Sequence, residues 1–303
     1  MLNIALNDRN EMKKHLVELM CTLPPQIKAQ CSESISIIAN VDFPQNWQNL
    51  LPELVQKFNS NDPSIVQGVL LTASSIVKRF RYVQRNDDLY RDILYVLERL
   101  QEPLLMIFKS TAQAVTGFSN DVAQLKPRFE SLRLICRIFF SLNWQDLPEY
   151  FEDHMSEWMD GFAKFLQYTN PLLTDDDEED EASPIDKLQE AIVENLELYA
   201  NKDEEPFIPF LPHFTSLVWN LLLKLSDKPK HDGLATTSIK FLSSLVAKQM
   251  HRDLFKDEGT LKQIISNIVV PNLVIREVRL IFIFLMISLK SFFSKLDILN
   301  FEH

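Results

Sequence analysis

Apolar residues recur at every third or fourth position through most of the chain, and this spacing predicts amphipathic α-helices. Polar turns, many of them with proline, separate the periodic stretches, so successive helices are expected to double back as hairpins. The sequence therefore predicts an all-α protein built from antiparallel helix pairs. The expected helices cover residues 25–39, 45–59, 63–80, 89–115, 121–142, 147–168, 184–200, 207–225, 233–250 and 261–269.

The best-defined turn lies at Asp42, Phe43 and Pro44. Pro44 fixes φ and lacks an N–H, which suits the start of the helix expected from about residue 45. Phe43 precedes that helix and is expected to fold back near Trp47 or Leu50, as a hydrophobic staple does. The structural signature of this hairpin consists of Asp42, Phe43, Pro44, Trp47, Leu51 and Pro52.

Short polar residues and prolines also predict where other helices begin or bend. Asp62 is expected to cap a helix whose first residue is Pro63. Pro103 is expected to bend the long helix over residues 89–115. Pro127 lies within the first turns of the next pattern, so that helix is expected to begin near residue 121 or only near Lys126.

A Leu-Pro pair recurs in alternate helices, at residues 51–52, 147–148 and 211–212, each with a tryptophan on the same expected helix. This alternation has the character of the first helix of a HEAT-type repeat, whose period is ~40–47 residues. Each helix pair buries its apolar face only against its neighbours, which favours an array of repeats. The predicted fold class is a HEAT-repeat α-solenoid over residues 1–276.

Composition supports helices and excludes several classes of protein. Only five glycines occur in 303 residues, which is too few for the tight turns of a sheet protein. The formal net charge is −11, so binding of nucleic acid through its phosphates is not expected. The three cysteines, Cys21, Cys31 and Cys136, lack the paired spacing of disulfides or zinc sites. An intracellular, reducing compartment is expected.

No catalytic, cofactor-binding or metal-binding motif is found, so the chain is not expected to be an enzyme and its function is expected to lie in binding surfaces. His154 has Glu152, Asp153 and Glu157 nearby on one expected helix. A metal site and a solvated helix face both fit this pattern, and charged residues on helices usually serve solubility. Cys136 falls in an apolar stripe and is expected in the core.

Two charged clusters are candidates for partner binding. The first is an acidic run, expected as an extended loop over residues 174–183, which either keeps the chain soluble or attracts a basic partner. The second is a basic cluster at the end of the helix over residues 63–80, which either complements the dipole of that helix or binds a partner. The acidic run consists of Asp175, Asp176, Asp177, Glu178, Glu179, Asp180 and Glu181. The basic cluster consists of Lys78, Arg79, Arg81 and Arg85.

The character of the chain changes in residues 277–303, a divergent tail. Residues 280–298 within it are nearly all apolar and lack the polar stripe of a repeat helix. A membrane span needs ~20 apolar residues, whereas Lys290 and Lys295 interrupt this stretch. Association with a membrane is therefore expected only through this tail.

Longer motifs resemble one family of nuclear transport receptors. The segment Val-Asp-Phe-Pro-Gln-Asn-Trp-Gln-Asn-Leu-Leu-Pro-Glu-Leu at residues 41–54 resembles a signature of the importin-β superfamily. The block Ser-Leu-Asn-Trp-Gln-Asp-Leu-Pro-Glu-Tyr-Phe-Glu-Asp-His-Met at residues 141–155 is similar to the exportin-2 family, the importin-α re-exporters of that superfamily. The acidic start at residues 174–179 also matches. The resemblance covers about residues 7–276.

This resemblance implies HEAT repeats, Ran-GTP as a partner and importin-α as export cargo. Ran-GTP and cargo would bind cooperatively, and GTP hydrolysis would release both. The resemblance also implies passage through the nuclear pore, with nuclear pore proteins as further partners, and a location in both nucleus and cytoplasm. The family pattern implies a fragment that starts inside the N-terminal repeats and departs after residue 276. Two functions remain as alternatives: a transport-receptor scaffold, or a truncated product that is non-functional or membrane-associated.

Overall fold

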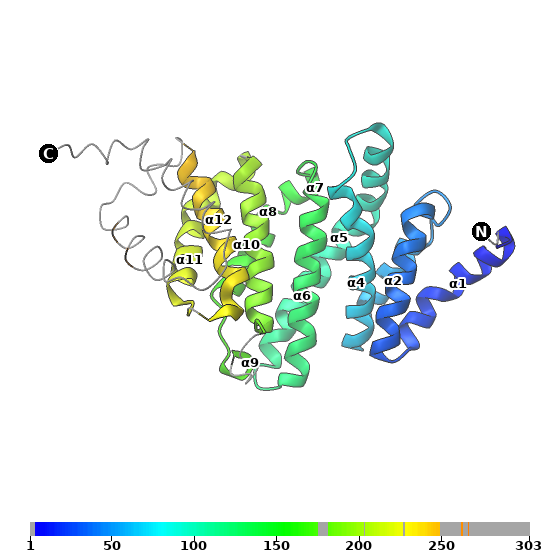
Figure 1. Ribbon diagram of the computed structural model, residues 1–303, viewed down its shortest axis with the longest axis horizontal. Helices are drawn as coiled ribbons and strands as arrows, with labels where there is room; N and C mark the ends of the chain where they lie inside the picture. The colour runs from blue at the N-terminus through cyan, green and yellow to red at the C-terminus, as the bar shows by residue number, and fades with distance from the viewer. Residues whose placement is uncertain are drawn as a thin grey trace. The chain divides into compact units, whose positions relative to one another are not determined.

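The computed structural model of the protein describes residues 4–174, 181–202, 204–226 and 228–248, together with Lys262 and Ser266. This described part consists of helices, turns and loops without a strand, so the all-α prediction is confirmed (Figure 1). The α-helices are α1 (Leu6–Thr22), α2 (Pro25–Asp42), α3 (Leu50–Gln56), α4 (Pro63–Lys78), α5 (Asp87–Gly117), α6 (Val122–Leu142), α7 (Glu149–Asp153), α8 (Met155–Leu166), α9 (Pro171–Thr174), α10 (Pro184–Lys202), α11 (Leu211–Lys224) and α12 (Asp232–Ala247). The 3-10 helices are η1 (Lys57–Asn59), η2 (Arg79–Arg81), η3 (Glu205–Phe210) and η4 (Pro229–His231).

The chain divides into two compact units, the first of residues 1–162 and 169–175 and the second of residues 163–168 and 176–303. In the first unit, α4 packs between α2 and α6 (Figure 1). The long helix α5 packs against α3 and α6. In the second unit, α12 packs against α10 and α11. The helices α2, α4 and α6 of the first unit are the second helices of successive pairs, and each lies against the next. In the second unit, α10 and α12 are related in the same way. Contact between the second helices of neighbouring pairs is the arrangement of HEAT repeats.

Aromatic side chains from four helices form the centre of the first unit. The fully buried ring of Trp158 on α8 lies 4.7 Å from the ring of Phe108 on α5 and 4.2 Å from the ring of Phe139 on α6, measured between centroids. Phe151 on α7 adds an edge-on contact. At Gly161, an added Cβ would lie 2.3 Å from Phe108. Glycine at this position therefore allows α8 to approach α5 closely.

Side-chain caps define the starts of α4 and α6. The Asp62 carboxylate accepts a hydrogen bond of 2.8 Å from the backbone N–H two residues on, and Pro63 is the first residue of α4. This start was predicted, and it is confirmed. The Asp121 carboxylate accepts from the N–H three residues on, at 3.1 Å, and α6 begins directly after it. The alternative start near Lys126 is therefore wrong, because a cap was available five residues earlier.

The helix expected over residues 45–59 is much shorter in the structure. Turns occupy most of residues 43–49, and α3 begins only at Leu50 before ending in η1. Asn46 and Asn49 favour turns, because their side chains can replace backbone hydrogen-bond partners. The prediction that Pro44 directly launches a helix is therefore wrong.

Two further helices differ from their predicted form. The helix expected over residues 147–168 is divided into α7 and α8 at His154. The helix expected over residues 207–225 begins as η3, where Pro206 and Pro209 each remove a backbone donor. The periodic spacing is correct in both cases, but it does not reveal these interruptions.

Several predictions concern residues outside the described part. They are the extended acidic run at residues 175–180, the helix over residues 261–269 apart from Lys262 and Ser266, and the apolar tail 277–303. Among the described helices, the stretch Glu205–Lys224 is long and apolar enough to cross a membrane by length and composition. Of its apolar window, 39% is buried inside the structure, and Phe207 and Phe214 are among the buried side chains.

Candidate protein-interaction site

A buried lysine anchors the signature turn that follows α2. The Lys13 ammonium on α1 lies 2.6 Å from the Asp42 carboxylate and donates a hydrogen bond of 3.0 Å to the carbonyl of Asn46. The same ammonium lies 5.7 Å from the centre of the Trp47 ring. The side chains of Lys13 and Asp42 are only 9% and 18% exposed, so this ion pair is largely shielded from water.

Most of the remaining signature residues are also buried, and Pro52 is half-buried. Phe43 is buried, and its ring meets the edge of Tyr95 on α5 at 5.7 Å between centroids. The guanidinium of Arg79 lies 5.5 Å from the Phe43 ring. The expected staple placed Phe43 near its own helix, whereas these ring and cation contacts come from α5 and from η2. Leu51 is fully buried as well, so the signature joins neighbouring repeats and offers little surface to a partner.

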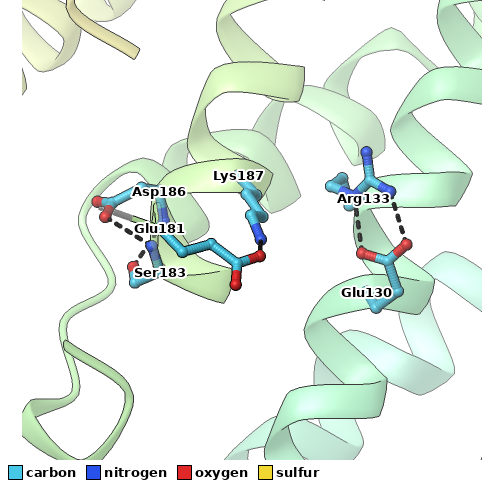
Figure 2. Close-up of polar contacts among 6 residues, drawn as sticks. All are labelled: Glu130, Arg133, Glu181, Ser183, Asp186 and Lys187. Atoms are coloured by element: carbon cyan, nitrogen blue, oxygen red, sulfur yellow. Dashed lines mark hydrogen bonds and ion pairs between the residues drawn. The ribbon is translucent and has the colours of Figure 1, made fainter. Parts of the chain in front are cut away.

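The acidic run ends at a well-formed helix start. Glu181, its last residue and the one that the structure describes, pairs with Lys187 (Figure 2). The Ser183 hydroxyl accepts a hydrogen bond from the backbone N–H of Asp186 at 3.1 Å, and the Asp186 carboxylate accepts from the N–H of Ser183 at 3.2 Å (Figure 2). This reciprocal pair is a capping box for α10. The C-terminal end of the acidic run therefore leads directly into the capped start of α10. Binding of a partner by the acidic run stays a prediction.

Replacing Ser183 with alanine is expected to lower the free energy of unfolding by about 1 kcal/mol, because one backbone N–H of α10 loses its cap. Chemical denaturation of the wild type and the variant measures this difference. Ser34→Ala on α2 is the control, because this serine is exposed and its loss is expected to change stability by less than about 0.5 kcal/mol. Equal effects of the two changes would contradict the capping role.

Two arginines of the basic cluster join neighbouring helices. Arg79 pairs with Asp92 on α5 at 3.0 Å and donates to the carbonyl of Ala39 near the end of α2 at 3.4 Å. Burial lowers the pKa of Arg79, and Asp92 partly offsets this effect. Arg81 donates to the Ser141 hydroxyl at 2.7 Å and to the carbonyl of Arg137 on α6 at 3.1 Å. Arg79 therefore bonds a carbonyl in the last turn of α2, and Arg81 bonds a carbonyl of α6, so the two cations connect η2 to neighbouring helices.

The other members of the basic cluster are more exposed. Arg85 pairs with Asp146 at 2.9 Å and donates to the Gln145 side chain at 3.0 Å. Lys78 is exposed. Three of the four cations bond residues of neighbouring helices or of the segment that follows α6. The basic cluster therefore mainly stabilises the packing of these elements against one another.

Charged residues on α6 show the same local pairing. Arg133 donates twice to the Glu130 carboxylate, at 2.6 and 2.7 Å, one turn away on the helix (Figure 2). Pairs at this spacing typically contribute a few tenths of a kcal/mol. Such pairs stabilise the surface of a helix and do not by themselves indicate a binding site.

The structure assigns packing contacts to the residues weighed earlier for chemistry. The Nδ1 atom of His154 lies 2.8 Å from the carbonyl oxygen of Tyr150, and the imidazole ring stacks on the Tyr150 ring at 4.1 Å between centroids. The Nε2 atom of His154 lies 3.9 Å from the Glu157 carboxylate. Cys136 is fully buried in α6. Within the described ranges, no three side chains of histidine, cysteine, aspartate or glutamate gather as metal ligands.

Comparisons with known proteins place these observations in context. The sequence profile of the family described as Cse1 matches residues 76–282. Over 269 residues, the chain is 43% identical to exportin-2 of Xenopus laevis and 42% identical to exportin-2 of Homo sapiens. Each match covers 89% of this chain and 28% of the relative, so the chain spans less than a third of the length of these relatives.

Solved structures give the same result at the level of fold. The structure titled "The exportin Cse1 in its cargo-free, cytoplasmic state" is similar with a TM-score of 0.86 at 35% identity, over 90% of this chain and 30% of that one. An engineered protein matches with a TM-score of 0.55 at 13% identity, a likeness that concerns fold alone. The predicted fold class, a HEAT-repeat α-solenoid, is confirmed.

Proposed function

Because the chain belongs to the Cse1 family of exportins, we propose that it forms part of a nuclear export receptor that binds importin-α together with Ran-GTP. The observation that carries this proposal is the match to exportin-2 over 89% of the chain at 42–43% identity. A transport receptor needs no catalytic site of its own, since the nucleotide chemistry belongs to Ran. The role of this chain is then to provide surfaces that bind partners. As part of a transport receptor, the chain would be found in both nucleus and cytoplasm.

The arrangement of helices suits this role. Repeats of the same kind present similar faces at regular intervals, and a partner can contact several of them at once. Once a partner is bound to one repeat, its other binding segments are held at a high effective concentration near the remaining repeats. Two ligands that favour the same arrangement of repeats bind cooperatively, and the coupling is reciprocal.

The acidic run contributes to the proposal through its charge. Seven adjacent carboxylates at residues 175–181 create a negative potential that speeds the encounter with a basic partner. In this proposal, the run increases the association rate, whereas packed surfaces of the repeats determine the dissociation rate.

A binding assay tests the proposed function. The purified chain is immobilised and exposed to importin-α with Ran loaded with a non-hydrolysable GTP analogue, or with Ran-GDP as the control. Binding of importin-α is expected only with the GTP form, and it is expected to be at least about tenfold weaker than binding to full-length exportin-2, because fewer repeats take part. Binding that is equal with both nucleotides would refute the proposal.

Two variants separate the roles of individual segments. A chain with residues 175–181 changed to asparagine and glutamine is expected to associate more slowly and with a weaker dependence on salt. A chain without residues 277–303 tests the membrane-associated alternative, because fractionation of cells should then move the protein from membranes to the soluble fraction. If the complete chain already fractionates as soluble protein and binds as proposed, that alternative is wrong.

A further inference from the structure

A groove of about 690 Å³ lies within the first unit, between the first half of α5 and the segment formed by residues 145–153. Its volume falls within the range of ordinary ligand sites, which is ~300–1,000 Å³. The groove follows α5 from Asn86 to Gln101, a distance of roughly 20 Å at the rise of an α-helix. This shape suits an elongated ligand better than a compact one.

Apolar side chains form the floor and both walls of the groove. Leu89 and Leu97 are almost fully buried, whereas Tyr90 and Leu94 are 60% and 40% exposed. Leu147 and Pro148 line the opposite wall. Large apolar side chains that remain exposed side by side in a groove are typical of an interaction site. They lie close to one face of α5, at the spacing at which a helix presents anchors to a partner.

Negative charge surrounds this apolar surface. Among the described residues that line the groove, Glu98, Asp146, Glu149 and Asp153 carry carboxylates, and Arg85 is the cation. Arg85 is occupied by Asp146 and by Gln145, as described above, whereas Glu149 and Asp153 are exposed. The edge of the groove is therefore acidic on the side of α7.

The surroundings of Tyr150 agree with this charge distribution. Tyr150 lines the groove, and burial raises the pKa of its hydroxyl, as do the nearby charges of Glu102 and Glu157. The contribution of the two carboxylates agrees with a negative potential beside Tyr150.

We propose that this groove binds a short basic segment of a partner protein, in which lysine or arginine residues flank one or two large apolar side chains. Burial of the apolar side chains against Tyr90 and Leu94 supplies affinity. Interaction of the cations with Glu149 and Asp153 favours basic segments over neutral or acidic ones. This site goes beyond the proposed function, because it would be a second, separate binding surface on the chain.

Fluorescence polarisation tests this proposal with the complete chain. The probe is a labelled synthetic peptide of about twelve residues, a length that matches ~18 Å of helix. It carries leucine and phenylalanine at every third or fourth position and lysine between them. Two comparison peptides replace either the lysines with glutamines or the apolar residues with alanines. Binding is expected for the first peptide, and it is expected to be at least about tenfold weaker for each of the others.

Two charge-matched variants locate the binding site. Leu94→Lys places a cation in the groove and is expected to weaken binding of the basic peptide by about tenfold or more. Met106→Lys is the control, because Met106 is on the same helix, is 64% exposed and does not line the groove. The control is expected to change binding less than about twofold. Equal weakening by both variants would mean that the peptide follows net charge alone, and the proposal would be wrong.

A second pair of variants tests the acidic edge. Reversal of Glu149 and Asp153 to lysine is expected to abolish the preference for lysine over glutamine in the peptide, whereas Asp160→Lys on α8 is expected to preserve it. Unchanged thermal unfolding confirms that the variants are folded. If the peptide binds only the chain without residues 277–303, the occupant of the groove is the apolar tail of this chain, which carries Arg279, Lys290 and Lys295. That result would overturn the assignment to a separate partner.

Discussion

Replacing Trp158 with alanine is expected to lower the free energy of unfolding by about 3–5 kcal/mol, the usual cost of removing a buried large aromatic side chain. Trp158 is fully buried, and it touches rings from α5, α6 and α7. The stacked contact with Phe108 and the tilted contact with Phe139 would be lost together, and the surrounding helices cannot close the space that remains. Chemical denaturation monitored by circular dichroism measures the loss.

The fold provides a control for this prediction. Trp144 is 39% exposed and lies beside Phe140 at 5.4 Å between ring centres, so Trp144→Ala is expected to cost less than about half as much. Trp158→Phe is expected to be milder than Trp158→Ala. The indole N–H of Trp158 is buried without a hydrogen-bond partner among the described residues, so no hydrogen bond is lost. Equal effects of Trp144→Ala and Trp158→Ala would show that the aromatic cluster is not the centre of this unit.

Replacing Asp42 with alanine is expected to destabilise the first unit by about 2–3 kcal/mol, because it leaves the shielded ammonium of Lys13 without its counter-ion. The pair joins α1 to the end of α2 at 2.6 Å. Lys13 also holds the carbonyl of Asn46 and lies over Trp47, so the turn after α2 should loosen as well. Thermal and chemical unfolding measure the change in stability.

A double-mutant cycle separates the ion pair from other contacts. Lys13→Met together with Asp42→Ala removes both charges, and this double variant is expected to be more stable than Asp42→Ala alone. Exposed pairs provide the comparison, since Arg91→Met next to Asp88 is expected to change stability by less than about 1 kcal/mol. If Asp42→Ala costs no more than Arg91→Met, the ion pair does not anchor the turn.

The sequence was sufficient to identify most of the long helices, although α1 (Leu6–Thr22) was not among those expected. Helical spacing of apolar residues depends only on local geometry, so the stripes that form α4, α5, α10 and α12 could be recognised without knowing their partners. Caps such as Asp62 are local as well, because the side chain bonds a backbone N–H two residues away. The resemblance of residues 141–155 to a receptor family likewise needs no three-dimensional information.

The contacts between repeats could not be predicted in this way, because they join residues distant in the chain. Nothing around Lys13 indicates that it will meet Asp42, and nothing around Arg81 indicates that it will reach Ser141 and α6. The apolar spacing continues through residues 43–49 and through His154, so the spacing did not reveal the breaks there.

The groove beside α5 illustrates the same difference. Tyr90 and Leu94 share the helical spacing of the buried Leu97, so the spacing alone does not distinguish them from core residues. Only the packing of α5 against the segment 145–153 leaves them exposed and brings Glu149 and Asp153 to the same edge. Local periodicity thus determines which residues form a helix, whereas the fit between helices determines which of them remain available to a partner.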